Sequence, residues 1–285
     1  MLVFCAALWG LGFVAMKEAL DAYPTFWILF FRFGLATLLM GVLFLRRIRQ
    51  ARRRDLIGGA AIGCFLFLGM GIQTLGLNYT TAGKQAFLTA SYVVMVPFLA
   101  WGTRKIFPGW TAMLGAVICF SGMGLLISDA AGPLNVGDVL TVVSALFFAM
   151  QIIAIASFAA EGDPLVLTFT QFFVTALLSL AAAPLAGSPL VFQGGRGVPE
   201  ILFAALFCTF LCFLIQNVAQ KYTTSTHASI LLGLESVFGV LSGIVLLGET
   251  FTLRMGVGCA LIFGAVLLVE LVPAWLKNGR CLPQE

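Results

Sequence analysis

Apolar runs of about twenty residues recur along almost the whole of this 285-residue chain and constrain its fold more than any other feature. A helix of that length crosses roughly 30 Å of hydrocarbon, whereas a barrel strand needs only about ten alternating residues. Only 10% of the residues are charged, compared with about 25% in soluble domains. The sequence therefore predicts an all-α integral membrane protein built as one helical bundle.

The apolar runs predict ten transmembrane helices joined by short connections. The expected spans are 2–20, 25–45, 56–77, 83–102, 108–128, 138–159, 164–183, 198–219, 227–247 and 252–275. Pro97 lies inside the fourth span and should bend it, because proline removes a helical hydrogen bond. The first run lacks the basic start and the small-residue cleavage site of a signal peptide, so we expect a retained first helix.

The distribution of basic residues predicts the orientation of the bundle. Six of the sixteen basic residues lie between Arg46 and Arg54, within one short connection. If the N-terminus is cytoplasmic, eleven basic residues fall on the inner side and four on the outer side. Short basic loops stay in the cytoplasm. We therefore expect a multi-pass protein of the plasma membrane, in bacteria the inner membrane, with both termini cytoplasmic. For the basic run from Arg46 to Arg54, setting this orientation is favoured over binding nucleic acid or lipid headgroups.

An internal repeat is visible at an offset of 143 residues. The hydroxyl-rich sequence Tyr-Thr-Thr precedes an apolar span at residues 79–81 and again at residues 222–224. Toward the N-terminus the offset is about 139, which pairs Trp9 with Phe148. Five helices is an odd number, so the second copy would be inserted upside down relative to the first. The two inverted five-helix repeats, which together form one membrane domain, are residues 1–130 and 131–285.

Several short motifs occur in a fixed order along the chain. They are Trp9-Gly10 with Phe13-Val14-Ala15, Phe31-Arg32-Phe33, the paired Tyr-Thr-Thr, Leu234-Glu235-Ser236-Val237-Phe238 and Leu247-Gly248-Glu249-Thr250. Together they resemble the drug/metabolite transporter superfamily, EamA type. The resemblance implies a ten-helix secondary transporter with helices one, three, four, six, eight and nine around a cavity. Ser236 departs from the proline that is common in this family, so we expect a straighter ninth helix.

Four residues near the middle of their predicted spans are candidates for a substrate site, on helices that the resemblance places around the cavity. They are Trp9, Tyr92, Phe148 and Gln151. Together they would form a pocket with aromatic walls and few polar groups, suited to an amino acid or an organic cation. Ordinary packing is the alternative for these aromatic residues, because the chain has 27 phenylalanines.

Two charged residues, Arg32 and Glu235, lie deep within their predicted spans, where hydrocarbon makes a charge costly. Burial disfavours the charged form of a carboxylate, so Glu235 could couple transport to protons. A structural bond to a neighbouring helix is favoured for it, because the motif is widespread in a family with diverse cargoes. Arg32 is expected to be a structural polar residue anchored by Glu18, Asp21 or a helix end, without a direct salt bridge to Glu235.

The other reactive side chains give little support for catalysis. The seven cysteines lack the spacing of a disulfide framework or a zinc site, and the single histidine belongs to no group with a nucleophile. The sequence has no phosphate-binding loop and no filter-like repeat of a channel. We therefore expect no catalytic residues, no metal and no cofactor, and transport driven by an ion gradient or by the substrate's own gradient.

The combined prediction is a secondary active transporter that moves small amphipathic metabolites by alternating access. Amino acids or related compounds, moved in the export direction, are the favoured cargo. Import of choline-like or other organic cations is the alternative, and a channel or a membrane enzyme is less favoured. The expected partners are a small-molecule substrate, the lipid bilayer and a proton if coupling exists. The pair Gly59 and Gly63 should pack helices together, with homodimer formation as the less favoured role.

Overall fold

The structure is a computed structural model that describes residues 1–105, 107–127, 135–187, 189, 195–247 and 252–278. In this part of the chain every regular element is helical, which confirms the all-α prediction. The elements are α1 (Leu2–Leu20), α2 (Thr25–Ile48), α3 (Arg53–Leu77), α4 (Ala82–Thr89), α5 (Tyr92–Arg104), α6 (Trp110–Ile127), α7 (Val136–Phe158), α8 (Pro164–Leu185), α9 (Val198–Phe203), the π-helix η1 (Ala204–Leu211), α10 (Cys212–Gln220), α11 (Ser225–Leu232), α12 (Glu235–Leu247) and α13 (Leu253–Asn278).

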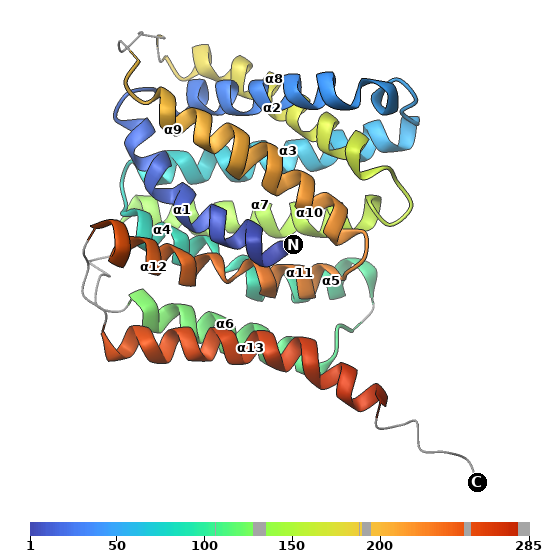
Figure 1. The fold of residues 1–285 in the computed structure, drawn as a ribbon, viewed down its shortest axis with the longest axis vertical. Helices are drawn as coiled ribbons and strands as arrows, with labels where there is room; N and C mark the ends of the chain where they lie inside the picture. The colour runs from blue at the N-terminus through green and yellow to red at the C-terminus, as the bar shows by residue number, and fades with distance from the viewer. Residues whose placement is uncertain (106, 128–134, 188, 190–194, 248–251, 279–285) are drawn as a thin grey trace.

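The helices run back and forth along one common direction, as expected of a membrane bundle (Figure 1). Among the described residues, seven helical segments are long and apolar enough to cross a membrane. Two of them combine consecutive elements, namely Ala82–Thr103 and Val198–Gln220. Two shorter apolar helices, Trp110–Leu125 and Gly256–Val269, accompany them. The predicted count of ten spans also needs these two helices and the α11–α12 pair, so it stays a prediction.

Two of the predicted spans are interrupted at matching positions. α4 ends at Thr89 and α5 begins at Tyr92, whereas α11 ends at Leu232 and α12 begins at Glu235. Both pairs of residues are separated by the offset of 143 that the sequence shows. The two halves of each span are therefore divided by a two-residue turn at equivalent places in the two repeats.

The ninth span, which we expect to be straighter than in relatives with proline, is interrupted between α11 and α12. A turn at Gly233 and Leu234 divides the helix although the residue after Glu235 is a serine. A Cβ atom added to Gly233 would lie 2.7 Å from Cε of Met123 and 2.9 Å from Cγ2 of Val93, so the turn packs against α5 and α6 as closely as glycine permits. The interruption of the fourth span precedes Pro97, which lies inside α5, so the bend expected at this proline stays a prediction.

The two Tyr-Thr-Thr sequences cap helices, as their composition predicted. The side-chain oxygen of Thr81 accepts a hydrogen bond from the amide of Lys84 at 3.3 Å and begins α4. Thr224 accepts from the amide of His227 at the same distance and begins α11. Each threonine satisfies one of the amides that a helix N-terminus leaves without a partner.

Glycines allow the closest helix contacts in the bundle. Added Cβ atoms at Gly59 and Gly63 would lie 2.6 Å from Cβ of Thr170 and 2.9 Å from the carbonyl oxygen of Gln171, both on α8. This pair therefore packs α3 against α8 within the same chain. At the edge of the bundle α6 lies beside α13 (Figure 1), where an added Cβ at Gly122 would lie 2.8 Å from the carbonyl oxygen of Gly258.

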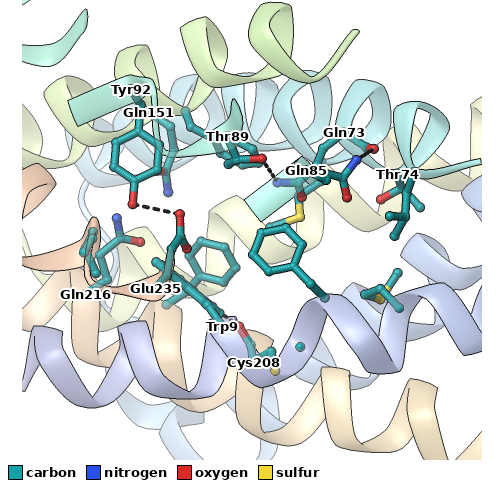
Figure 2. A pocket seen from close by; sticks show the side chains of 18 of the residues that line it. Trp9, Gln73, Thr74, Gln85, Thr89, Tyr92, Gln151, Cys208, Gln216 and Glu235 are labelled. Carbon is teal, nitrogen blue, oxygen red and sulfur yellow. Dashed lines mark hydrogen bonds between the residues drawn. The ribbon is translucent and has the colours of Figure 1, made fainter. Parts of the chain in front are cut away.

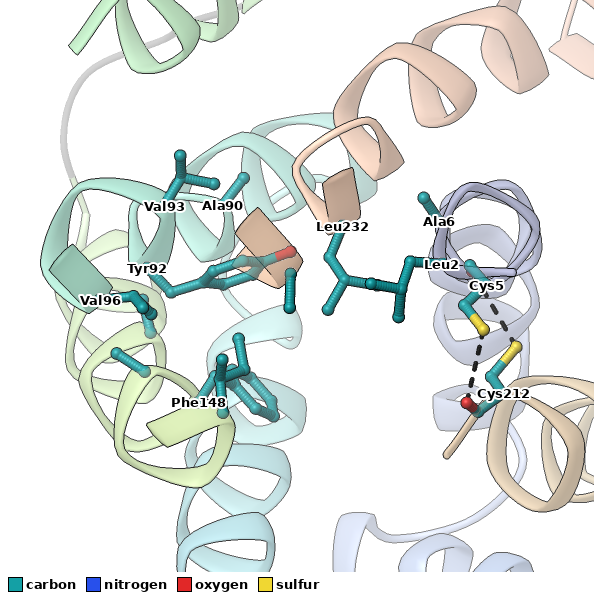
Figure 3. Close-up of a cluster of buried hydrophobic side chains, with 14 of the residues drawn as sticks. Leu2, Cys5, Ala6, Ala90, Tyr92, Val93, Val96, Phe148, Cys212 and Leu232 are labelled. Atoms are coloured by element: carbon teal, nitrogen blue, oxygen red, sulfur yellow. Dashed lines mark hydrogen bonds between the residues drawn. The ribbon is translucent and has the colours of Figure 1, made fainter. Parts of the chain in front are cut away.

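The largest buried cluster joins α1, α5, α7, α10 and α11, and part of it is drawn in Figure 3. At one side of this view Cys5 of α1 meets Cys212 of α10, where the Cys5 thiol donates to the carbonyl oxygen of Cys212 at 3.4 Å. Tyr92 and Phe148 belong to the same cluster and are labelled at the other side of the view. The cysteines of this cluster act as small packing residues, the role that the sequence favoured.

The variant Gly10→Ala is expected to lower the free energy of unfolding by about 1–3 kcal/mol, because it overpacks a close contact. The added Cβ would lie 2.7 Å from the amide nitrogen of Gly239 and 2.8 Å from Cβ of Phe238, which forces α1 away from α12. Thermal unfolding in detergent measures the change. Gly34→Ala is the matched control, since its Cβ meets nothing within 4 Å. Equal melting temperatures for the two variants would contradict the close approach of α1 and α12.

Candidate functional site

A central cavity lies inside the bundle beside the two helix interruptions. It contains about 700 Å³ of space not filled by atoms, including the space at its opening. Its walls come from α1, α2, α3, α7, η1, α10 and both halves of the two interrupted spans. Figure 2 shows the cavity with its polar side chains labelled.

All six residues that the sequence singled out line this cavity. They are Trp9, Arg32, Tyr92, Phe148, Gln151 and Glu235. They come from five different elements, α1, α2, α5, α7 and α12, so only the tertiary fold brings them together. Their role in binding a substrate stays a prediction.

Glu235 and Tyr92 are bonded to each other at the middle of the cavity wall. The Tyr92 hydroxyl donates to Oε1 of Glu235 at 3.0 Å (Figure 2), and the two residues are only 4% and 3% exposed. Each is the first residue of the second half of its span. The N-terminus of α12 adds favourable helix-dipole interaction for the carboxylate. The two equivalent positions of the repeats therefore meet in one hydrogen bond.

Aromatic side chains form the apolar wall of the cavity. The Trp9 indole donates to the carbonyl oxygen of Cys208 at 2.8 Å, which holds the ring of α1 against η1. The Trp9 ring also lies 5.1 Å from that of Phe213, measured between centroids. Phe148 enters from α7 over Gly69, whose missing side chain leaves room for the ring. These residues give a substrate apolar surface to contact.

Two glutamines flank the Tyr92–Glu235 pair in Figure 2. Gln151 and Gln216 are each 1% exposed. Within the described part of the chain, Nε2 of Gln151 and Oε1 of Gln216 have no hydrogen-bond partner. A buried amide atom without a partner costs free energy. The cavity thus presents a carboxyl group, a phenol and two amides at one place, where they can donate and accept hydrogen bonds.

A second polar group lies on the opposite side of the cavity, where Gln73, Thr89 and Gln85 are linked (Figure 2). Nε2 of Gln73 donates to the Thr89 hydroxyl at 2.9 Å, and Nε2 of Gln85 donates to the Gln73 carbonyl oxygen at 2.6 Å. The sequence analysis did not select Thr89 or Gln85 for the site. Their polarity within an apolar span was a usable signal, because such residues rarely face lipid.

Arg32 contacts neither of its expected anchors. Glu18 and Asp21 are exposed, and the Arg32 Nε donates instead to the hydroxyl of Thr209 on η1. The expected anchoring by these carboxylates is wrong, because the arginine points into the bundle. In the described residues Arg32 also forms no ion pair with Glu235, in agreement with the sequence analysis.

A buried ion pair fixes the start of α4 to the start of α7. Nζ of Lys84 lies 2.6 Å from Oδ2 of Asp138, and the two side chains are 8% and 2% exposed. The Thr80 hydroxyl donates to the other carboxylate oxygen at 3.0 Å. Asp138 also accepts from the amide of Asn135 at 2.8 Å in a capping box. This network lies outside the central cavity and joins the two repeats.

The described residues contain no group of three or more His, Cys, Asp or Glu side chains that could hold a metal ion. Only Leu247 of the motif Leu247-Gly248-Glu249-Thr250 lies in the described part of the chain. The chemistry available in the cavity is therefore that of hydrogen bonds, two buried charges and aromatic rings.

The sequence matches the model of the EamA-like transporter family at residues 1–128 and again at residues 135–271. An uncharacterized transporter of Archaeoglobus fulgidus is 34% identical over 270 residues, which cover 95% of this chain and 84% of the relative. The uncharacterized transporter YrdR of Bacillus subtilis is 26% identical over 129 residues, 42% of this chain and 40% of that protein. A solved structure described only as "Crystal structure of protein" is similar over 97% of both chains, with a TM-score of 0.80 and 16% identity, which shows a shared fold.

Proposed function

This chain belongs to the EamA-like transporter family, and we propose that it is a secondary active transporter of small amphipathic metabolites that works by alternating access. The favoured cargo is an amino acid or a related compound, moved in the export direction. The observation that carries the proposal is the cavity in which the equivalent residues Tyr92 and Glu235 meet. A site at the interface of two repeats can be exposed to either side when one repeat moves against the other.

The proposal includes ten spans arranged as two inverted repeats, residues 1–130 and 131–285. The two matching family segments, the matching interruptions and the matching threonine caps support this arrangement. Contacts between α6 and α13 support it further. Gly122 approaches Gly258, and Gly115 approaches Ala265. At the offset of 143, Gly122 corresponds to Ala265 and Gly115 corresponds to Gly258. Each contact is therefore the counterpart of the other, as a two-fold axis between the repeats requires.

The proposed location is the plasma membrane, the inner membrane in bacteria, with both termini in the cytoplasm. The eleven basic residues on one side against four on the other support this orientation. The proposed partners are the substrate, the bilayer and a coupled proton at Glu235. The protein is proposed to act as a carrier without catalysis, driven by the gradient of an ion or of the substrate.

Import of an organic cation is the second candidate function. The observation in its favour is the combination of Glu235 with the rings of Trp9, Tyr92 and Phe148 in one cavity. A quaternary ammonium is attracted by aromatic faces and by a carboxylate. This candidate and the favoured one differ in whether the cargo also carries an anionic group.

Counterflow in proteoliposomes is expected to show saturable exchange for one compound class. Vesicles with the purified chain are loaded with unlabelled amino acids, polyamines or quaternary amines, and uptake of the labelled compound is followed. Trp9→Ala is expected to raise the half-saturation concentration about tenfold, because it removes a wall of the cavity and its stacking. Trp9→Phe, which keeps a ring, is the matched control. Transport that does not saturate would indicate a channel, and no exchange in folded protein would contradict this function.

A further inference from the structure

Arg32 is a buried cation that no carboxylate of the described chain neutralises. Its side chain lines the central cavity, and the residue is 4% exposed. The ion pairs of the described residues involve Arg47, Arg54 and Lys84. Leaving a charge buried without a counter-charge is costly. The folded protein nevertheless keeps this unpaired charge at a position that lines the cavity.

The neighbours of Arg32 satisfy only a small part of its hydrogen-bonding capacity. A guanidinium has five N–H donors. In the described chain Nε donates to the Thr209 hydroxyl, and Nη1 lies 3.6 Å from the Met16 sulfur and 4.0 Å from the Met70 sulfur. The guanidinium also lies 5.6 Å from the centroid of the Phe33 ring. Thioether sulfurs are weak acceptors, so this surrounding orients the arginine but does not neutralise it.

Glu235 places a carboxyl group in the wall of the same cavity. It accepts from Tyr92, and the ion pairs of the described residues do not include it. Arg32 and Glu235 do not pair with each other. Apolar groups such as Trp9 and Phe213 also line the cavity. The cavity therefore offers a carboxyl group and a guanidinium that stay separate.

We propose that Arg32 binds the carboxylate of a zwitterionic substrate whose ammonium group lies against Glu235 and the ring of Trp9. A planar guanidinium binds a carboxylate with two parallel hydrogen bonds. The carboxylate of a bound zwitterion neutralises the buried Arg32 and its ammonium is bonded by the Glu235 carboxyl group, whereas a simple cation leaves Arg32 uncompensated. This assignment rests on the proposed transport function, and it selects amino acids over organic cations as the cargo.

The test compares each of two amino acids with its primary amide. Wild-type protein in proteoliposomes exchanges labelled L-leucine or L-phenylalanine, and the unlabelled acid or amide competes. The assay is run at about pH 6, below the usual range of an α-amino group, so that acid and amide both carry the ammonium. The amide is expected to compete at least about tenfold more weakly, because it lacks the charge that Arg32 binds. Equal competition by acid and amide would overturn the assignment.

The variant Arg32→Gln tests whether this preference depends on the arginine. It is expected to weaken competition by the acid strongly and by the amide little, so that the ratio falls toward one. Arg32→Lys keeps the positive charge and should keep part of the ratio. If Arg32 were only structural, Arg32→Gln would weaken both competitors equally and leave the ratio unchanged, which overturns the assignment.

Three further results would decide between the assignment and the transport function. If Arg32→Gln does not fold, the wild-type ratio and Arg32→Lys decide, and a wild-type ratio of one overturns the assignment. If folded wild-type protein exchanges neither amino acids nor any other class of the panel, the transport function itself is contradicted, and the assignment falls with it. Exchange of quaternary amines in preference to amino acids leaves transport standing and overturns only the zwitterion assignment.

Discussion

The Glu235→Gln variant is expected to lose proton-driven accumulation of substrate and to keep exchange at saturating substrate. Glutamine has nearly the same shape as glutamate and still offers Tyr92 an acceptor oxygen, so the bond at 3.0 Å can be retained. It cannot take up or release a proton. Uptake into proteoliposomes with an imposed pH gradient measures coupling, and counterflow without a gradient measures exchange. Accumulation is expected to fall to passive equilibration.

Tyr92→Phe is the matched control for this prediction. It removes the donor of the same hydrogen bond and leaves the carboxylate in the cavity. This variant should still respond to the pH gradient. If Glu235→Gln loses exchange and accumulation to the same extent, Glu235 holds the helices together instead of carrying the proton, and coupling by this residue is contradicted.

The Asp138→Ala variant is expected to show the largest loss of stability, about 3–5 kcal/mol, because it removes one partner of a buried ion pair. The substitution takes away the carboxylate beside Lys84, the acceptor of the Thr80 hydroxyl and the side chain that caps α7 through Asn135. Thermal and denaturant unfolding of the detergent-solubilised protein, compared with the wild type, measures the loss.

An exposed ion pair provides the control. Arg54 contacts Glu161, but these side chains are 56% and 69% exposed, so Arg54→Ala should change stability by less than about 1 kcal/mol. The double variant Lys84→Met with Asp138→Leu is expected to recover part of the loss, because it leaves no charge unpaired at this place. An Asp138→Ala protein as stable as Arg54→Ala would show that the buried pair contributes little.

The helical bundle could be predicted closely from the sequence because the length and polarity of a span are local properties. The predicted span 164–183 corresponds to α8 at Pro164–Leu185, and 198–219 corresponds to the continuous segment Val198–Gln220. The Tyr-Thr-Thr caps were found for the same reason, since the capping oxygen and the amide that it accepts from lie three residues apart.

The interruptions of the helices could not be predicted in the same way. The turn at Gly233 depends on the approach of Val93 and Met123, which are 140 and 110 positions away in the chain. The sequence analysis placed a bend at Pro97 and none at residue 233. A close contact between distant segments decides where each helix breaks, and a single residue type does not reveal that contact.

The sequence analysis predicted neither partner of the two charged residues. Tyr92 stands 143 positions before Glu235, the offset of the repeat, and its hydroxyl donates to that carboxyl group. For Arg32 the nearby acidic residues Glu18 and Asp21 were the natural choice, but the arginine reaches Thr209, 177 positions away. Repetition carries long-range information in a sequence, and proximity along the chain does not.

The sequence by itself determined that this chain is an all-α membrane protein and which residues cap its interrupted spans. It also identified six side chains as candidate site or polar structural residues. These properties follow from hydrophobicity, from hydrogen bonds within one turn and from an internal repeat. Only the tertiary structure decided that the six side chains share one cavity, that Gln85 and Phe213 join them, and that Arg32 lies there without a carboxylate. The reason is that the rotation of each helix about its axis, which decides which side chains face inward, is fixed by contacts with helices distant in sequence.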